Sequence, residues 1–298
     1  MPDNLRSWLK KQWVFIIALL SSVALFGIFM YSIGLHSENP DLTPPEPSAG
    51  EIQRQKTALS AHLISEIAKQ HPQLSALGAA GEAWEKAWGG VWVPWPEGAP
   101  AGYQNPELSL TPAATDIPAL QSELLNFANL SIQAGSSHTA RQLGISTSAK
   151  ARYYIALLAK ESGNNGETAV DITPGSLKEL GKAVSGSEEL NRLEALRQQL
   201  QNTTAELAFS ERENRLQLLD SLNALIDGAL ANKVTDTRPV MVDPDMKVAD
   251  LGAALCGELL TLGERSEASA RETAAEVLAQ ILQVFPNDSA FPGWQPAN

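Results

Sequence analysis

Residues 187–230, SEELNRLEALRQQLQNTTAELAFSERENRLQLLDSLNALIDGAL, show the pattern that recurs through most of the chain. Leucine and isoleucine return every three or four positions, the spacing that places side chains on one face of an α-helix. Ser187 can cap the first turn, and the acids Glu188 and Glu189 favour the positive end of the helix dipole. The pattern predicts one long helix, with a break or an exposed turn at the polar residues 211–215.

The rest of the chain is also predominantly helical in pattern. The same spacing predicts further helices at 51–70, 79–89, 118–134, 147–162, 174–184, 247–262 and 265–285. Only 91–93 and 240–242 hint at extended pieces. We therefore expect an all-α fold in which residues 51–298 form a mostly antiparallel helical bundle, interrupted by a long, irregular Pro/Gly/Trp-rich loop at 90–118.

An uninterrupted apolar run, WVFIIALLSSVALFGIFMYSIGL, occupies residues 13–35 and contains no Asp, Glu, Lys, Arg or His. As a helix it would reach roughly 34 Å, enough to cross a hydrocarbon core of about 30 Å. It is longer than the apolar region of a cleaved signal peptide, and no A-x-A-like cleavage site follows it. We expect an uncleaved transmembrane signal anchor, with Trp8 and Trp13 at one membrane interface and Tyr31 near the other.

The charges around this run predict its orientation. Arg6, Lys10 and Lys11 precede the run, whereas no lysine or arginine follows it before Arg54. The positive-inside rule therefore places residues 1–12 in the cytoplasm and the main domain outside it, in a single-pass protein of the cell membrane. Residues 36–50, HSENPDLTPPEPSAG, are rich in proline and acid and are expected to form a stiff, solvated linker.

The charge balance excludes one class of partner. Residues 1–35 hold three basic residues and one acidic residue, which leaves 19 basic and 33 acidic residues, a net charge of −14, in residues 36–298. Nucleic-acid binding requires a basic surface, so no nucleic-acid partner is expected. Cys256 is the only cysteine and lies in an apolar helical run, where we expect it to be a buried small side chain.

Motifs for catalysis or metal binding are missing from the sequence. The histidines do not form H-x-x-H, H-E-x-x-H or E-x-x-H pairs, and no G-x-S-x-G, P-loop or G-x-G-x-x-G motif occurs. The acidic residues are numerous, and a solvated helix surface accounts for them. No catalytic, cofactor-binding or metal-ligating residue is therefore predicted. The four histidines are His36, His62, His71 and His138.

A dense group of aromatic residues is the main functional signal in the main domain. Trp84 and Trp88 share one face of a predicted helix, which indicates core positions. Trp92 and Trp95 lie with Tyr103 in the irregular loop, where they can contact a partner protein, pack over the core, or bind sugar rings or lipid. The residues predicted to contact a partner are Trp92, Trp95, Tyr103 and, in the C-terminal tail, Trp294.

The layout of the chain resembles a known group of proteins. It combines a short basic N-terminus, the apolar span at 13–35, a TPPEP linker and an Ala-rich acidic helical domain. This layout is similar to that of membrane-anchored exported proteins of actinobacteria, some of which are accessory subunits of the cytochrome bcc–aa3 respiratory supercomplex. The resemblance implies a structural role on the outer face of an oxidase assembly, with no haem or copper ligand in this chain.

Three functions are compatible with these features. The first is a non-enzymatic accessory subunit that caps an integral membrane protein complex on its extracytoplasmic side. The second is an extracytoplasmic module that binds a ligand or a cell-wall polymer through the Trp-rich loop. The third is an enzyme whose site the sequence does not reveal.

Overall fold

The computed structural model describes residues 3–32, 46–95, 98–105, 108–135, 137–161, 172–238 and 250–294. These residues form ten α-helices and two short 3₁₀ helices, without a β-strand, so the predicted all-α class is confirmed. The chain divides into two units, residues 1–45 and residues 46–298, which are described separately. The segments 33–45 and 239–249 lie outside the described residues. The first contains most of the predicted linker, and the second contains the extended piece expected at 240–242.

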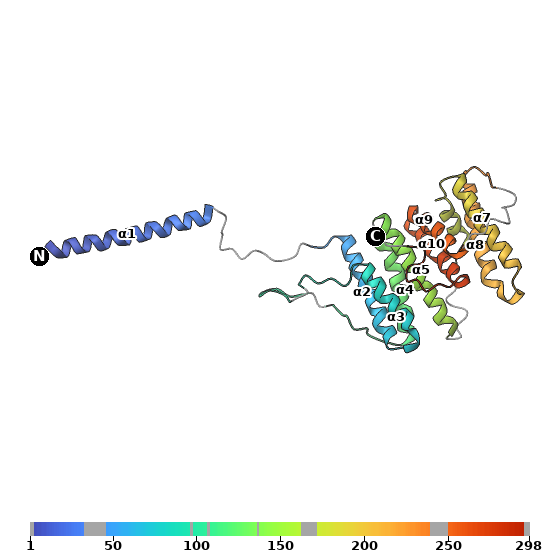
Figure 1. The fold of residues 1–298 in the computed structure, drawn as a ribbon, viewed down its shortest axis with the longest axis horizontal. Helices are drawn as coiled ribbons and strands as arrows, with labels where there is room; N and C mark the ends of the chain where they lie inside the picture. The colour runs from blue at the N-terminus through green and yellow to red at the C-terminus, as the bar shows by residue number, and fades with distance from the viewer. Residues whose placement is uncertain are drawn as a thin grey trace. The chain divides into compact units, whose positions relative to one another are not determined.

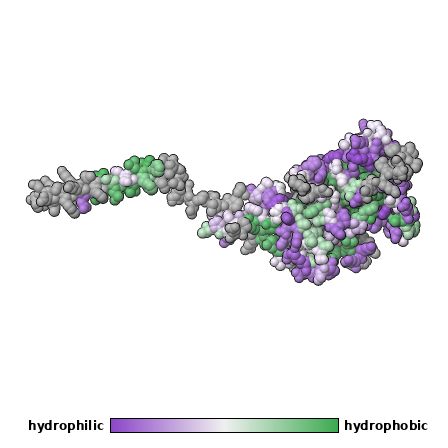
Figure 2. Space-filling view, viewed as in Figure 1, coloured by the Kyte–Doolittle hydropathy of each residue, from purple (hydrophilic) through white to green (hydrophobic). Residues whose placement is uncertain are grey.

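The described part of the first unit is the helix α1, which runs over Asp3–Ser32 (Figure 1). Large apolar side chains between Trp13 and Phe29 are exposed, and Trp13 itself is 65% exposed. Figure 2 shows hydrophobic residues on the visible face of this helix. The side chains of Trp8 and Tyr31 and residues 33–35 of the predicted span lie outside the described part. Within the described residues, no helix combines the length and the apolar character that crossing a membrane requires.

The second unit is a helical domain with two hydrophobic cores. The helices α2 (Ala49–Lys69), α3 (Ser75–Ala87) and α4 (Ile117–Ala134) pack around the first core. The second core is built from α6 (Pro174–Gly181), α7 (Ser187–Ala205), α8 (Glu213–Ala231), α9 (Leu251–Arg265) and α10 (Ala268–Val284). The short helices η1 (Pro72–Leu74) and η2 (Phe209–Glu211) precede α3 and α8.

Helix α5 (His138–Glu161) joins the two cores because it contributes to both of them (Figure 1). Leu143 and Leu158 pack in the first core, whereas Ile145 and Ala149 pack in the second. Its start was predicted at residue 147, which is nine residues too late. The segment 138–146 holds few large apolar residues, and Gly144 permits a close approach of α5 to α4: a Cβ there would lie 2.3 Å from the carbonyl oxygen of Ser131.

The single helix predicted over 187–230 is wrong. The structure divides it into α7 and α8, which end and begin on either side of residues 206–212. The guanidinium of Arg212 donates to the carbonyl oxygens of Ala205, at 2.9 Å, and Leu207, at 2.8 Å. These bonds satisfy carbonyl groups at the end of α7 that a continuous helix would have paired internally. The expected polar break therefore exists, but it lies slightly earlier than 211–215.

Candidate functional site

The loop between α3 and α4 leaves the helical domain and returns to it (Figure 1). Its described residues, 91–95, 98–105 and 108–116, contain neither helix nor strand, including the extended piece expected at 91–93. Gly89 and Gly90 begin it with φ angles of +83° and +74°, a backbone conformation that is natural for glycine and ends α3. Two consecutive left-handed residues thus turn the chain out of the bundle immediately after Trp88.

A side-chain clamp closes the aromatic part of this loop. The backbone N–H of Trp95 donates to Asn105 Oδ1 at 3.0 Å, and Asn105 Nδ2 donates to the carbonyl oxygen of Trp95 at 2.8 Å. The side-chain amide of Asn105 therefore satisfies both the N–H and the carbonyl group of Trp95, as the backbone of a neighbouring β-strand would. The clamp brings the rings of Trp95 and Tyr103 together, with centroids 5.4 Å apart. We refer to Trp92, Trp95, Tyr103 and Asn105 as the aromatic loop.

The aromatic residues divide between core and surface. Trp84 and Trp88 are buried in the first core, which confirms their predicted core positions. Trp92 is 45% exposed, and Trp95 and Tyr103 are partly exposed. The aromatic loop therefore presents apolar rings to its surroundings, and its role in partner binding stays a prediction.

Trp294 has a different environment, because the C-terminal segment is bound across the domain. Three buried donors hold carbonyl oxygens of this segment: Trp84 Nε1 bonds Ala290 at 2.8 Å, Ser146 Oγ bonds Pro292 at 3.0 Å, and Lys150 Nζ bonds Asn287 at 2.5 Å. Trp294 packs against both cores, with its ring centroid 5.3 Å from that of Phe291. The predicted contact residue is thus part of a strap over the domain, and residues 295–298 lie outside the described part.

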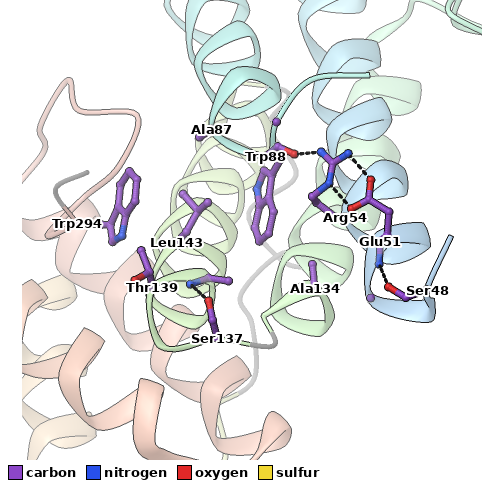
Figure 3. Close-up of a pocket in the computed structure, with 13 residues that line it drawn as sticks. Ser48, Glu51, Arg54, Ala87, Trp88, Ala134, Ser137, Thr139, Leu143 and Trp294 are labelled. Atoms are coloured by element: carbon purple, nitrogen blue, oxygen red, sulfur yellow. Dashed lines mark hydrogen bonds and ion pairs between the residues drawn. The ribbon is translucent and has the colours of Figure 1, made fainter. Parts of the chain in front are cut away.

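A cleft of about 590 Å³ opens at one end of the first core (Figure 3). The ends of four helices and the C-terminal strap meet there. Trp88, Leu143 and Trp294 provide its large apolar walls. The cleft is lined at the start of α2 by Ser48, Gly50, Glu51 and Arg54, at the ends of α3 and α4 by Ala87, Trp88, Gly89 and Ala134, at the start of α5 by Ser137, Thr139, Ala140 and Leu143, and by Trp294.

Two helices begin at this cleft with the same capping arrangement. Ser48 Oγ accepts the N–H of Glu51 at 3.2 Å, and Ser137 Oγ accepts the N–H of Ala140 at 3.2 Å. Each serine thus caps the third residue of its helix and leaves the first two N–H groups without an intrahelical acceptor. The second residues of the two helices, Gly50 and Thr139, both line the cleft. The S-x-x-E pattern of Ser48 and Glu51 is the local sequence signal for the first of these caps.

Glu51 and Arg54 form an ion pair on the same wall. Arg54 Nη2 and Nε donate to the two carboxylate oxygens of Glu51 at 2.6 and 2.8 Å, and Arg54 Nη1 donates to the carbonyl oxygen of Trp88 (Figure 3). Hydrogen bonds from Arg54 and then from Gln55 lower the pKa of Glu51 to about 2. The pair also ties the start of α2 to the end of α3.

This pair predicts an acid-sensitive contribution to stability. Because the folded-state pKa of Glu51 is depressed from 4.5 to about 2, the contribution is complete above pH 4.5 and is lost as the pH falls through 2. The Glu51 side chain is 38% exposed, so solvent screening limits the contribution to about 0.5–1 kcal/mol. Glu51→Gln should lower the free energy of unfolding by that amount at pH 7 and by less at pH 2.5. Equal effects in urea titrations at the two pH values would contradict this.

The cysteine and the described histidines are buried or paired with other groups of the protein. Burial raises the pKa of the Cys256 thiol to about 12, so it is protonated at neutral pH, and its predicted burial is confirmed. Three histidines have polar partners. His62 contacts Glu85 at 3.0 Å, His71 contacts the carbonyl oxygen of Thr115 at 2.6 Å, and His138 contacts Glu264 at 2.5 Å. No group of three or more histidine, cysteine or acidic side chains that could hold a metal occurs in the described part of the chain.

Comparison with family models, curated proteins and solved structures finds no match for this chain. The features that bear on function are therefore the aromatic loop, the cleft and the exposed apolar surface of α1.

Proposed function

We propose that this protein is a non-enzymatic, single-pass accessory subunit that binds a larger membrane protein complex on its extracytoplasmic side. The observation that carries the proposal is the surface of α1. A helix with apolar side chains around its whole circumference needs an apolar environment, either lipid or protein. The exposed residues are Trp13, Ile16, Ile17, Leu19, Leu20, Val23, Leu25, Phe26, Ile28 and Phe29.

The membrane-anchor part of the proposal also draws on the sequence. Side chains are described in α1 only at residues 12–13 and 16–29, whereas the apolar run extends over 13–35. We propose that the full run is the anchor, with residues 1–12 in the cytoplasm and residues 36–298 outside. The basic residues on the N-terminal side and their absence from residues 36–53 support this orientation.

The aromatic loop is the proposed docking element of the helical domain. Large, rigid aromatic side chains lose little conformational entropy on binding and are common at the centres of protein interfaces. The Asn105 clamp reduces that cost further, because the loop is already closed before a partner binds. The narrower proposal, from the resemblance in layout, is that the partner is a respiratory supercomplex.

The test is co-migration of the tagged full-length chain with its complex after extraction in a mild detergent. The Trp92→Ala/Trp95→Ala double variant should reduce the retained complex by about tenfold or more, because each interface anchor contributes on the order of 1–2 kcal/mol. Its helical circular-dichroism signal should be unchanged.

Phe209→Ala is the matched control. Phe209 is 88% exposed in η2, outside the aromatic loop, so its removal should leave the complex intact. Equal loss of the complex in the control and the double variant would contradict docking through the loop. A chain that runs alone under all mild conditions would contradict the accessory role and favour the ligand-binding alternative.

A further inference from the structure

We propose that the cleft beside Trp88 and Trp294 binds a small amphipathic carboxylate. Its carboxylate would lie at the converging starts of α2 and α5, and its apolar body would lie against Trp88, Leu143 and Trp294. The cleft is distinct from the aromatic loop, so this site does not depend on the proposed accessory role.

The first argument is the convergence of two helix N-termini. Helices of 21 and 24 residues begin here, and each has a partial positive charge at its start. The N–H groups of Gly50 and Thr139 have no acceptor within their own helices. At Gly50 the backbone is open, since the one atom of the described residues beyond the neighbouring backbone that an added Cβ would meet is Ser48 Oγ, at 4.0 Å. Two such starts around one cleft form a natural anion site.

The second argument is an independent buried donor. Trp88 is only 4% exposed, and its Nε1 has no hydrogen-bond partner within the described residues. Figure 3 shows this nitrogen on the ring edge toward Leu143, which also lines the cleft. An unpaired buried N–H is unfavourable, and an acceptor on a ligand would satisfy it after a small adjustment of the walls.

The charge of the cleft is compatible with a single negative group. Glu51 is the only acidic residue among those lining it, and Arg54 neutralises it through two hydrogen bonds. The carbonyl ends of α3 and α4 also reach the cleft, and Arg54 binds one of these carbonyl oxygens, that of Trp88. The N–H groups at the starts of α2 and α5 are therefore the groups that an anion would contact. A compact monoanion fits this arrangement better than a multiply charged group, which would also approach the Glu51 carboxylate.

The apolar walls specify the rest of the ligand. Two indole rings and Leu143 are the large apolar side chains that line this open cleft of about 590 Å³, a volume within the range of small-molecule sites. A fully hydrated anion would leave these walls in contact with water. A flat or short apolar body joined to the carboxylate would cover them.

The probe is 3-phenylpropionate, titrated calorimetrically into the full-length chain in phosphatidylcholine nanodiscs, with empty nanodiscs subtracted. Two further compounds separate the contributions of its carboxylate and its apolar body. 3-Phenylpropan-1-ol has the apolar body without the charge, and acetate has the charge without the apolar body. Inorganic phosphate tests for a general anion site. We expect 3-phenylpropionate to bind about tenfold or more tightly than each of them. Equal binding of the alcohol, of acetate or of phosphate would overturn the proposal.

The decisive variant is Thr139→Glu, which places a carboxylate at the second residue of α5. An acid at this position is favourable for the helix, so the variant should fold, and its side chain should compete with the ligand. Asn214→Glu is the matched control, because it adds the same charge at the second residue of α8, outside the cleft. We expect Thr139→Glu to weaken binding by about tenfold or more and Asn214→Glu to leave it unchanged.

Trp88→Phe removes the indole N–H and retains an aromatic wall. This variant should lower the affinity for 3-phenylpropionate by about fivefold, which is the effect of losing one neutral hydrogen bond. Its melting temperature should stay close to that of the parent protein. Full affinity in both Thr139→Glu and Trp88→Phe would show that the compound binds elsewhere and would overturn the assignment.

Discussion

Trp84→Ala should lower the free energy of unfolding by about 3–5 kcal/mol, the range for removing a buried tryptophan. Trp84 is fully buried and stacks on Phe127, with ring centroids 4.8 Å apart. Its Nε1 also holds the C-terminal strap through the carbonyl of Ala290. The substitution therefore creates a large cavity and releases one anchor of the strap. Urea titration of the full-length chain in detergent, followed by far-ultraviolet circular dichroism, measures the effect.

Two further variants separate the contributions of Trp84. Trp84→Phe removes the bond to the strap but keeps most of the ring volume, so it should be clearly less destabilising than Trp84→Ala. Trp92→Ala is the control at the surface and should change the free energy of unfolding by no more than about 0.5 kcal/mol. A loss of more than about 2 kcal/mol at Trp92 would place that residue in the core and contradict its proposed docking role.

Gly181→Ala and Gly228→Ala should each destabilise the domain by about 1–3 kcal/mol or more, because they overpack the contact between α6 and α8. An added Cβ at Gly181 would lie 2.1 Å from the carbonyl oxygen of Leu225. At Gly228 it would lie 2.4 Å from the carbonyl oxygen of Lys178. Both obstacles are backbone atoms, so a side-chain rotation cannot relieve the clash, and the two helices must separate.

Gly257→Ala in α9 is the matched control for this pair. Among the described residues, no atom outside the neighbouring backbone of α9 lies within 4 Å of an added Cβ at that position. Alanine should therefore stabilise the helix by about 0.5–1 kcal/mol through the lower entropy of its unfolded chain. Urea titrations of the three variants under the same conditions test the difference in sign. A small effect at Gly181 and Gly228 would mean that α6 and α8 do not approach as closely as the structure indicates.

Helix prediction from the sequence succeeded where apolar periodicity was strong. The helices expected at 118–134 and 265–285 correspond to α4 at Ile117–Ala134 and α10 at Ala268–Val284. Prediction was less accurate in 138–146, where Gly144 permits a close approach of two helices but the sequence produces no apolar period. The break between α7 and α8 was misplaced because it depends on Arg212, whose hydrogen bonds end α7.

The two candidate sites also differ in how far the sequence could predict them. The aromatic loop was predictable, since proline, glycine and tryptophan at 90–103 identify an irregular segment with large rings. The cleft was not, because it assembles residues from five separate segments between Ser48 and Trp294. No local pattern could have indicated that the helices containing Gly50 and Thr139 begin beside one another.

Local sequence patterns were sufficient for the all-α class, the burial of Trp84, Trp88 and Cys256, and the irregular loop, because each depends on neighbours a few positions away. The apolar run at 13–35 likewise predicts an anchor without reference to the rest of the chain. The division into two cores, the strap held by Trp84, Ser146 and Lys150, and the cleft required the tertiary structure. These features arise from contacts between residues that are far apart in the sequence, and such contacts form only when the helices pack.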